Sequence, residues 1–306
     1  MAHSVRKKHL LSPGSRLLSR GSHVRGRGAQ VLGGGLPVLG GGSHALSPGS
    51  VSVGCESFEG MLIERAYVNL PEGEGTAEDG WPWTVPCVRQ LAEEGLRFRA
   101  PVTFLVGENG SGKSTLAEAL AEGFGLDSYG GSAGYKYASS REASLLGGLM
   151  RFDPTREGRG MIRGPRTHRR GFFLRAETAL EALNGERRAQ RLSRSPDEMS
   201  HGEGFLLAFR ERFAQRGLYV LDEPEAALSF SSCLELIGLM GELGSGGAQI
   251  ICATHSPLLT ALPGAEIVEV GEHGMRRVQW AELGLVDHWR RYLSDPRAYL
   301  RHVLAG

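Results

Sequence analysis

Lysine, paired cysteines and long apolar runs are all scarce in this 306-residue chain. The 4 cysteines are widely separated and form neither a C-x-x-C pair nor a metal-ligand spacing. We therefore expect buried thiols in a reducing cytosol, and no disulfide or zinc site. No apolar run approaches the roughly 18 residues that a membrane-spanning helix needs. A hydrophobic content of 41% and a charged content of 23% fit a globular cytoplasmic protein.

Charge is unevenly distributed along the chain. The net charge is +1, but the first 60 residues hold seven Arg or Lys and two Glu, which leaves 28 basic and 32 acidic residues from Met61 onward. This balance excludes a generally basic nucleic-acid binder for the main body. One local exception runs from Arg156 to Arg175, with seven Arg and a single acid, Glu157. Such a cluster fits a nucleic-acid backbone, the phosphates of a second nucleotide, an acidic protein patch or a solvated face.

The first 60 residues are a low-complexity segment of Gly, Ser, Arg and Pro without apolar periodicity. We expect disorder there. The Arg-rich, acid-poor composition also resembles an organelle transit peptide, and a third interpretation is that translation begins at Met61. The predicted organisation is therefore an extension over 1–60 and a folded domain over 61–306.

A glycine-rich turn between a strand and a helix is the most informative stretch. An apolar run at 102–106 has strand residues, and 114–120 has the pattern of a helix start. Between them Gly107, Gly112, Lys113 and Ser114 fit the spacing G-x-x-x-x-G-K-[ST] of a phosphate-binding loop. Glycines allow backbone N–H groups to point at a polyphosphate, to which the helix adds its positive end. A chance match in a chain with 45 Gly and few Lys is on the order of one per cent.

Two later strand-like runs end in polar residues. The run 217–221 leads into Asp222 and Glu223, and the run 249–253 leads to His255. A carboxylate pair after a strand is the usual partner of a phosphate loop, because one acid holds Mg²⁺ and the other polarises the attacking water.

Strands alternate with helices along the rest of the chain. We expect strands at 61–70, 96–100, 102–106, 171–175, 217–222, 249–253 and 266–270, and helices at 114–123, 177–191, 200–215, 231–243 and, interrupted by Pro296, 287–304. The pattern predicts an α/β fold with a largely parallel sheet and chemistry at the carboxyl ends of its strands. In the rigid run 81–86, one indole either stacks on adenine or plugs the sheet.

Four motifs in this order resemble an ATPase domain of the ABC superfamily, the P-loop branch shared by transporter motors, chromosome-maintenance ATPases and RecF-like repair ATPases. The motifs are G-E-N-G-S-G-K-S-T (107–115), M-S-H-G-E (199–203), L-Y-V-L-D-E-P-E-A-A-L-S (218–229) and A-T-H-S-P (253–257). More narrowly, the chain from about residue 61 is similar to small, stand-alone bacterial predicted ATPases. The resemblance implies a P-loop NTPase fold with an antiparallel edge sheet and a helical signature subdomain over 125–215.

The resemblance also implies residue roles in Mg-dependent ATP hydrolysis. Glu223 would be the general base, His255 the switch histidine, and Lys113 a contact of the γ-phosphate. Mg²⁺ would lie near Ser114 and Asp222. ATP would be bound by the loop and the signature, that is, by Gly107, Glu108, Asn109, Gly110, Ser111, Gly112, Lys113, Ser114, Thr115, Ser200 and Gly202.

In this family the signature residues complete the site of the opposite subunit, so the active unit would be an ATP-sandwiched homodimer. Two departures stand out. The usual L-S-G-G-Q reads with His201 and Glu203 in place of a glycine and the glutamine, and no Gln occurs between Lys113 and Gln190. Glu177 is our substitute for the missing glutamine as a metal or water contact.

Four functions compete at this stage. The first is a soluble ATPase switch, with nucleic acid as one candidate target, and the second is the motor of a transporter with a separate membrane partner. A small-molecule kinase is disfavoured, because Asp222, Glu223 and His255 suit attack by water and no acceptor motif is present. A nucleotide-dependent binding module with little turnover is kept open by the altered signature.

Overall fold

A computed structural model of the chain describes residues 60–70, 80–127, 131–132, 144–165, 168–175, 206, 209–210, 213 and 215–304. All of them lie in one compact unit, Gly54–Gly306. Glu177, Ser200 and Gly202 fall outside the described residues, as do most of the predicted extension and much of the predicted subdomain over 125–215.

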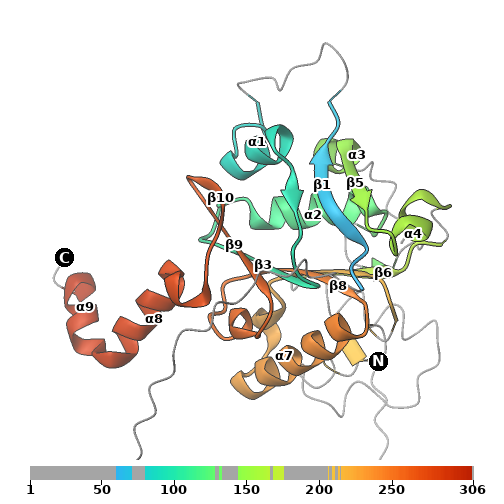
Figure 1. Cartoon of the computed structure of the whole chain (residues 1–306). Helices are drawn as coiled ribbons and strands as arrows, with labels where there is room; N and C mark the ends of the chain where they lie inside the picture. Colours follow the sequence, from blue (N-terminus) through green and yellow to red (C-terminus); the bar gives the residue numbers. More distant parts are fainter. Residues whose placement is uncertain are drawn as a thin grey trace, which may run out of the picture. The chain divides into compact units, whose positions relative to one another are not determined.

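A seven-stranded sheet, in the order β10-β9-β3-β8-β7-β6-β4, forms the centre of this unit (Figure 1). Its five inner strands pair in parallel, and β10 and β4 pair antiparallel at the two edges. The predicted α/β fold with a mostly parallel sheet is confirmed. The strands are β3 (Val102–Val106), β4 (Gly131–Ser132), β6 (Gly171–Arg175), β7 (Leu218–Asp222), β8 (Gln249–Thr254), β9 (Glu266–Gly271) and β10 (Gly274–Arg277).

Helices cover both faces of this sheet, which explains why β3, β7 and β8 are buried along their whole length and are mostly apolar. Along β3, Leu105 packs into a core with α2, whereas Phe104 and Val106 pack into a second core with α7. Figure 1 accordingly shows α7 on one side of the sheet and α1 and α2 on the other. The helices are α1 (Pro86–Glu93), α2 (Lys113–Phe124), α3 (Leu145–Leu149), α4 (Arg159–Arg163), α7 (Phe230–Ser245), α8 (Gly284–Ser294) and α9 (Pro296–Leu304).

Helix ends follow local chemistry. Gly125 ends α2 in the left-handed conformation with φ 92°, close to the predicted end at 123, because glycine adopts that conformation without a Cβ penalty. Pro296 separates α8 from α9 and starts α9. The strand expected at 96–100 is shorter, β2 (Leu96–Arg97), and α1, α3, α4 and β10 were not foreseen.

A second, three-stranded antiparallel sheet has the order β2-β1-β5, with β1 (Ile63–Val68) and β5 (Met150–Pro154). The predicted first strand is therefore present, and it belongs to this separate sheet. Of the two indoles before α1, Trp83 is buried in the core and acts as the plug, whereas Trp81 is 67% exposed. No described helix has the length and apolarity to span a bilayer.

One buried glutamine joins the two sheets. Gln249 is fully buried at the start of β8. Its Oε1 accepts hydrogen bonds from the backbone N–H groups of Leu62 (3.0 Å) and Ile63 (2.8 Å), and its Nε2 donates to the Ile63 carbonyl (3.1 Å). The side chain therefore satisfies three buried backbone groups at the start of β1.

We expect Gln249→Leu to lower the free energy of unfolding by about 2–5 kcal/mol, because three buried backbone groups lose their partner while the volume is retained. Urea denaturation of the full chain measures this. Gln215→Leu, at an exposed glutamine, is the matched control and should change stability by less than about 0.5 kcal/mol. Equal urea midpoints for the two variants would contradict the stabilising role of Gln249 between the two sheets.

Candidate nucleotide-binding site

Parallel register brings the ends of three strands to one edge of the sheet. Val106 of β3 is level with Thr254 of β8, and Ala253 of β8 is level with Asp222 of β7. The residues that follow these positions therefore start from the same edge. In this way the fold brings the glycine loop to the carboxylate pair and His255, which follow it by more than 100 positions in sequence.

The glycine loop has the backbone geometry that phosphate binding requires. Gly110 and Gly112 have φ of 80° and 101°, a region that favours glycine. At Gly107 an added Cβ would lie 2.0 Å from the carbonyl oxygen of Val270, so no other side chain fits. The loop passes directly over β9 and enters α2 at Lys113.

Lys113 is buried beneath the loop. It is 3% exposed, and its Nζ donates to the Glu108 carbonyl at 2.9 Å. Burial lowers the pKa of Lys113, and the nearby carboxylates of Glu223 and Asp222 oppose that effect. A buried ammonium held by one neutral carbonyl is under-compensated, and an incoming polyphosphate supplies the missing negative charge.

Ser114 and Asp222 form an oxygen pair beside the loop. Ser114 Oγ donates to Asp222 Oδ1 at 3.0 Å, and Arg175 Nε lies 3.9 Å from Asp222 Oδ2. Burial raises the pKa of the Asp222 carboxyl, although the Ser114 hydrogen bond and Arg175 act against it. A hydroxyl and a carboxylate are the oxygen ligands that Mg²⁺ takes when phosphates and water complete its shell. The donor set therefore fits Mg²⁺, and no group of three His, Cys, Asp or Glu metal ligands occurs among the described residues.

Glu223 and His255 face each other across the gap between β7 and β8. His255 Nε2 lies 3.1 Å from Glu223 Oε1, at ion-pair distance but without the alignment of a hydrogen bond. In the described part of the chain, Glu223 is the one non-glycine residue with positive φ, at 52°. That backbone costs about 1 kcal/mol or more, and it is held by the Glu223 N–H bonded to the Ala253 carbonyl at 2.9 Å.

Glu225 is a site residue that the sequence reasoning missed. Its Oε1 accepts from Thr254 Oγ1 at 2.6 Å and from the His255 N–H at 2.7 Å, so it fixes the turn that carries the histidine. Its Oε2 is buried and has no hydrogen-bond partner among the described residues. The sequence signal that could have identified it is the second glutamate of D-E-P-E, two positions after Glu223. Its role is visible only in the structure, where its turn contacts the end of β8.

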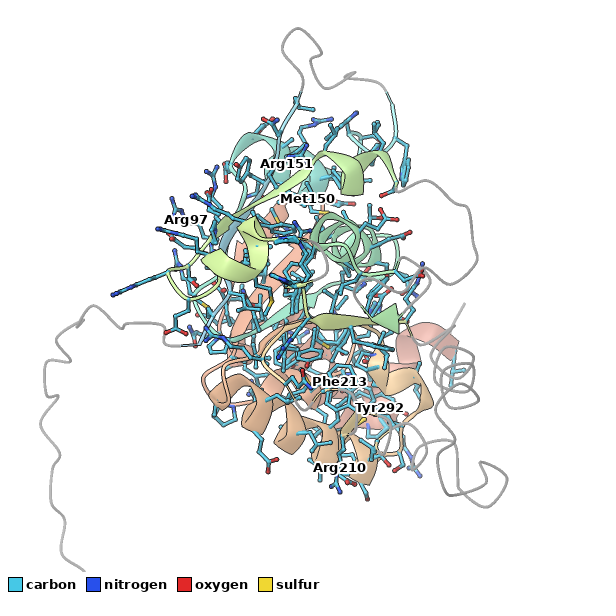
Figure 2. All side chains as sticks on the ribbon, turned by 90° about the vertical axis from the view of Figure 1, so that its right-hand side faces the viewer. Arg97, Met150, Arg151, Arg210, Phe213 and Tyr292 are labelled. Atoms are coloured by element: carbon cyan, nitrogen blue, oxygen red, sulfur yellow. The ribbon has the colours of Figure 1, made fainter. Side chains whose placement is uncertain are left out.

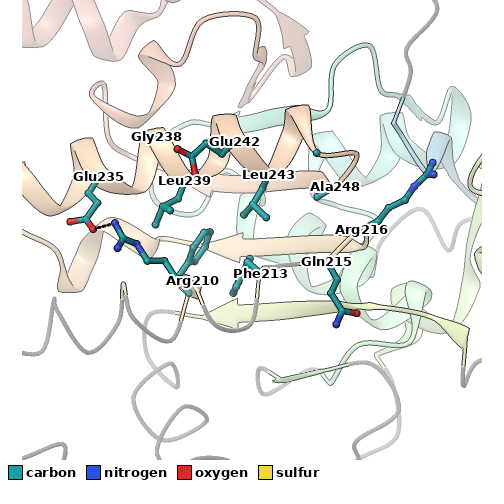
Figure 3. Close-up of a pocket in the computed structure, with 12 residues that line it drawn as sticks. Arg210, Phe213, Gln215, Arg216, Glu235, Gly238, Leu239, Glu242, Leu243 and Ala248 are labelled. Carbon is teal, nitrogen blue, oxygen red and sulfur yellow. Dashed lines mark hydrogen bonds and ion pairs between the residues drawn. The ribbon is translucent and has the colours of Figure 1, made fainter. Parts of the chain in front are cut away.

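Two cavities bear on where a ligand binds. One, of about 570 Å³, is lined by loop residues 107–111 together with His255, Glu269, His273 and His288. Another, of about 650 Å³, lies between α7 and the segment that includes Phe209, Phe213 and Arg216, with the Arg210–Glu235 ion pair at one end (Figure 3). The second cavity contains no loop or carboxylate-pair residue, so the chemistry belongs to the first.

Most of the predicted site residues meet in space. The loop residues Gly107 to Thr115, Asp222, Glu223 and His255 come together at the sheet edge. Their functional roles stay predictions. Glu177, Ser200 and Gly202 lie outside the described residues. A glycine loop between a buried parallel strand and a helix, with a neighbouring strand ending in acids, defines a P-loop nucleotide-binding protein.

Comparison with known proteins identifies the branch. Residues 98–226 match the family described as ABC transporter, and residues 203–261 match the family described as AAA domain, putative AbiEii toxin, Type IV TA system. The chain therefore carries an ABC-type ATP-binding domain. It is 27% identical over 176 residues to the macrolide export ATP-binding/permease protein MacB of Nitrobacter winogradskyi, a match over 51% of this chain and 26% of the relative. The chain thus matches about a quarter of that protein's length.

Solved structures with a similar course of the chain include cbiO1 from Clostridium perfringens, part of the ABC transporter complex cbiONQ. It has a TM-score of 0.41 and 17% identity, over 80% of this chain and 98% of that one. The SMC head domain from Thermotoga maritima has a TM-score of 0.35 and 18% identity, over 60% of this chain and 92% of that one. The assignment depends on the sequence matches and the site geometry.

We expect Asp222→Asn to stabilise the ligand-free protein near neutral pH. Because folding raises the carboxyl pKa, the folded state favours the protonated form, and the ionised form carries a penalty that asparagine removes. The sign follows: the parent gains stability relative to the variant as pH falls toward the unfolded-state value of 3.8. Thermal melts of both proteins from pH 8 to pH 5 measure the gap, with Asp153→Asn, at a half-exposed carboxylate on β5, as the control. A gap that widens toward acid pH would contradict this.

Proposed function

We propose that this chain hydrolyses the β–γ phosphoanhydride of Mg-ATP as an ATP-sandwiched homodimer and acts as an ATP-driven switch. The observation that supports the proposal best is the meeting of Glu223 and His255 at the loop edge, 3.1 Å apart. A kinase needs a place for an acceptor molecule. This arrangement instead presents a carboxylate and an imidazole to the position of the terminal phosphate.

In the proposed reaction, a water oxygen bonds to the γ-phosphorus while the bond between that phosphorus and the β–γ bridging oxygen breaks. ADP and phosphate leave. Glu223 accepts the proton of the water, and His255 donates a hydrogen bond to the γ-phosphate. Lys113 exchanges its Glu108 carbonyl for phosphate oxygens, which compensate its buried charge.

Ser114 and Asp222 would hold Mg²⁺, which neutralises charge on the phosphates when it is bound. Burial raises the pKa of the Asp222 carboxyl, and the nearby Glu223 carboxylate adds to that effect, so a bound cation would stabilise the ionised form. Glu177 stays our candidate for a further metal or water contact. The chain's own contribution is to keep these groups at a buried edge where the charges act strongly.

The homodimer part of the proposal derives from Ser200 and Gly202, which would reach the nucleotide on the opposite subunit. In the part of the site that the structure describes, the glycine loop offers hydrogen-bond donors on one side. On the other side, 40% of the Glu223 side chain is exposed to solvent. A second protomer covering that edge would exclude water from the reacting groups.

A second candidate function is the nucleotide-binding subunit of a membrane transporter. It is favoured by the match of residues 98–226 to the ABC transporter family and by the likeness to a macrolide export protein. In that case a separate membrane component would be the partner. Co-purification with membranes that survives high salt would favour it over the soluble switch.

Glu223→Gln tests the reaction and the dimer together. The amide cannot accept the proton, so we expect turnover to fall about 10²–10⁴-fold while ATP binding is retained. Light scattering with Mg-ATP should show the variant accumulating as a dimer, because hydrolysis no longer separates the subunits.

The control is Glu93→Gln, at an exposed acid at the end of α1 that lines neither of the two cavities described above. It should hydrolyse ATP like the parent. A Glu223→Gln protein that stays monomeric and hydrolyses ATP at the parental rate would contradict both the general-base role of Glu223 and the ATP-sandwiched homodimer.

Glu225 gives a second test, of positioning. We expect Glu225→Ala to lower kcat about 10–100-fold with a smaller change in KM, because the His255 turn loses both of its hydrogen bonds to the carboxylate. Glu225→Gln retains a carbonyl oxygen at the same place and should recover most of the rate. Equal kcat values for the Glu225→Gln and Glu225→Ala variants would contradict a positioning role for the contact between Glu225 and His255.

A further inference from the structure

A face remote from the glycine loop carries arginines without carboxylate partners. Arg156 precedes α4, Arg159 and Arg163 begin and end it, and Arg151 lies on β5. All four are exposed, and none forms a salt bridge among the described residues. Arg151 donates through Nη1 alone, to the Gly148 and Met150 carbonyls, and its other donors stay available. We call these four residues the arginine face; Figure 2 looks toward it and labels Arg151.

The acids nearest in sequence are already engaged. Asp153 lies 4.0 Å from Arg65, and Glu157 pairs with Arg216. A basic residue of each pair thus cancels the acid that would otherwise neutralise the face. Unpaired arginines at this density repel one another, and a polyanion relieves that repulsion.

The arginine face borders a cavity of about 420 Å³. Arg151 and Arg163 line it with the aromatic rings of Tyr67 and Phe152, and no acid contributes to the wall. Tyr67 of β1 is level with Arg151 of β5, so the two side chains leave the same face of the small sheet, and the Arg65 guanidinium lies 5.2 Å from the centre of the Tyr67 ring. In a single strand of nucleic acid, aromatic rings can stack on the bases while neighbouring arginines bind the phosphates.

Arg169 makes the floor of this cavity rigid. It donates to the Phe124 carbonyl at 2.7 Å and to the Ile162 carbonyl at 3.2 Å, and its guanidinium lies 5.6 Å from the Phe124 ring centre. It therefore ties the last turn of α2 to α4. The cavity lies at the end of α2 and the glycine loop at its start; 12 residues separate them, about 18 Å of helix. The cavity is thus distinct from the ATP site, yet α2 connects the two.

We propose that the arginine face and its cavity bind the phosphate backbone of a single nucleic-acid strand, with a base entering between Tyr67 and Arg151. A strand fits better than a free nucleotide, because Arg156 and Arg159 lie beyond the cavity lining and would meet neighbouring phosphates. Arginine, with a planar fork of donors, is the side chain best suited to such contacts. The main body's net negative charge confines the binding to this face.

The test is fluorescence anisotropy of a labelled 20-nucleotide single strand with the full chain, from 50 to 200 mM salt. We expect Arg159→Glu/Arg163→Glu to weaken binding at least tenfold and to reduce the slope of log K against log salt by about 1–2. Arg297→Glu/Arg301→Glu is the matched control, with the same charge change at the same spacing on exposed α9, and it should bind like the parent. Arg159→Gln/Arg163→Gln should be intermediate. Equal ATP binding and equal melting temperatures exclude misfolding.

Three outcomes would overturn the proposal. The first is that the parent does not bind the strand, or that the α9 control loses as much affinity as the α4 variant. The latter result would mean a general charge effect. The second is binding that survives in the α4 variant, which would assign it to the basic first 60 residues. The third is tripolyphosphate, or vesicles containing phosphatidylserine, binding with the same α4 dependence while the strand binds no tighter; the face would then take small phosphates or a lipid surface.

Discussion

Parallel pairing of β3 with β8 and of β8 with β7 is the constraint from which the rest of the site follows. The three strands are mostly apolar because helices cover both faces, so their charged groups are confined to the strand ends. Register then fixes which ends meet. A shift of one residue would reverse which side chains enter each core, and burial on both faces therefore specifies the register strongly.

The price of this arrangement is buried charge. Lys113 and Asp222 are both more than nine-tenths buried. Burial lowers the pKa of Lys113 and raises the pKa of Asp222, so it favours the neutral form of each side chain. Glu223 adds a strained backbone at the same edge. These features make the ligand-free site less stable than an apolar edge would be, and an anionic nucleotide with a cation offsets that cost by supplying charges of both signs.

The two ends of α2 give the molecule a physical connection between separate surfaces. Lys113 begins the helix at the glycine loop, and Arg169 holds its last carbonyls against α4. At the edge of the sheet, Glu225 plays a comparable part by joining the turn after β7 to the end of β8. Both are single side chains that connect elements far apart in sequence, and both turn local composition into positioned chemistry.

The sequence by itself determined the strand-loop-helix unit around Lys113, the alternation of strands and helices, and the carboxylates after β7, because each depends on short-range periodicity and spacing. The joint made by Gln249, the place of β1 in a second sheet and the role of Glu225 were decided only by the tertiary structure. These depend on contacts between residues 29 to 187 positions apart. A polar side chain gives no sign in sequence of which backbone groups it will satisfy once the chain is closed.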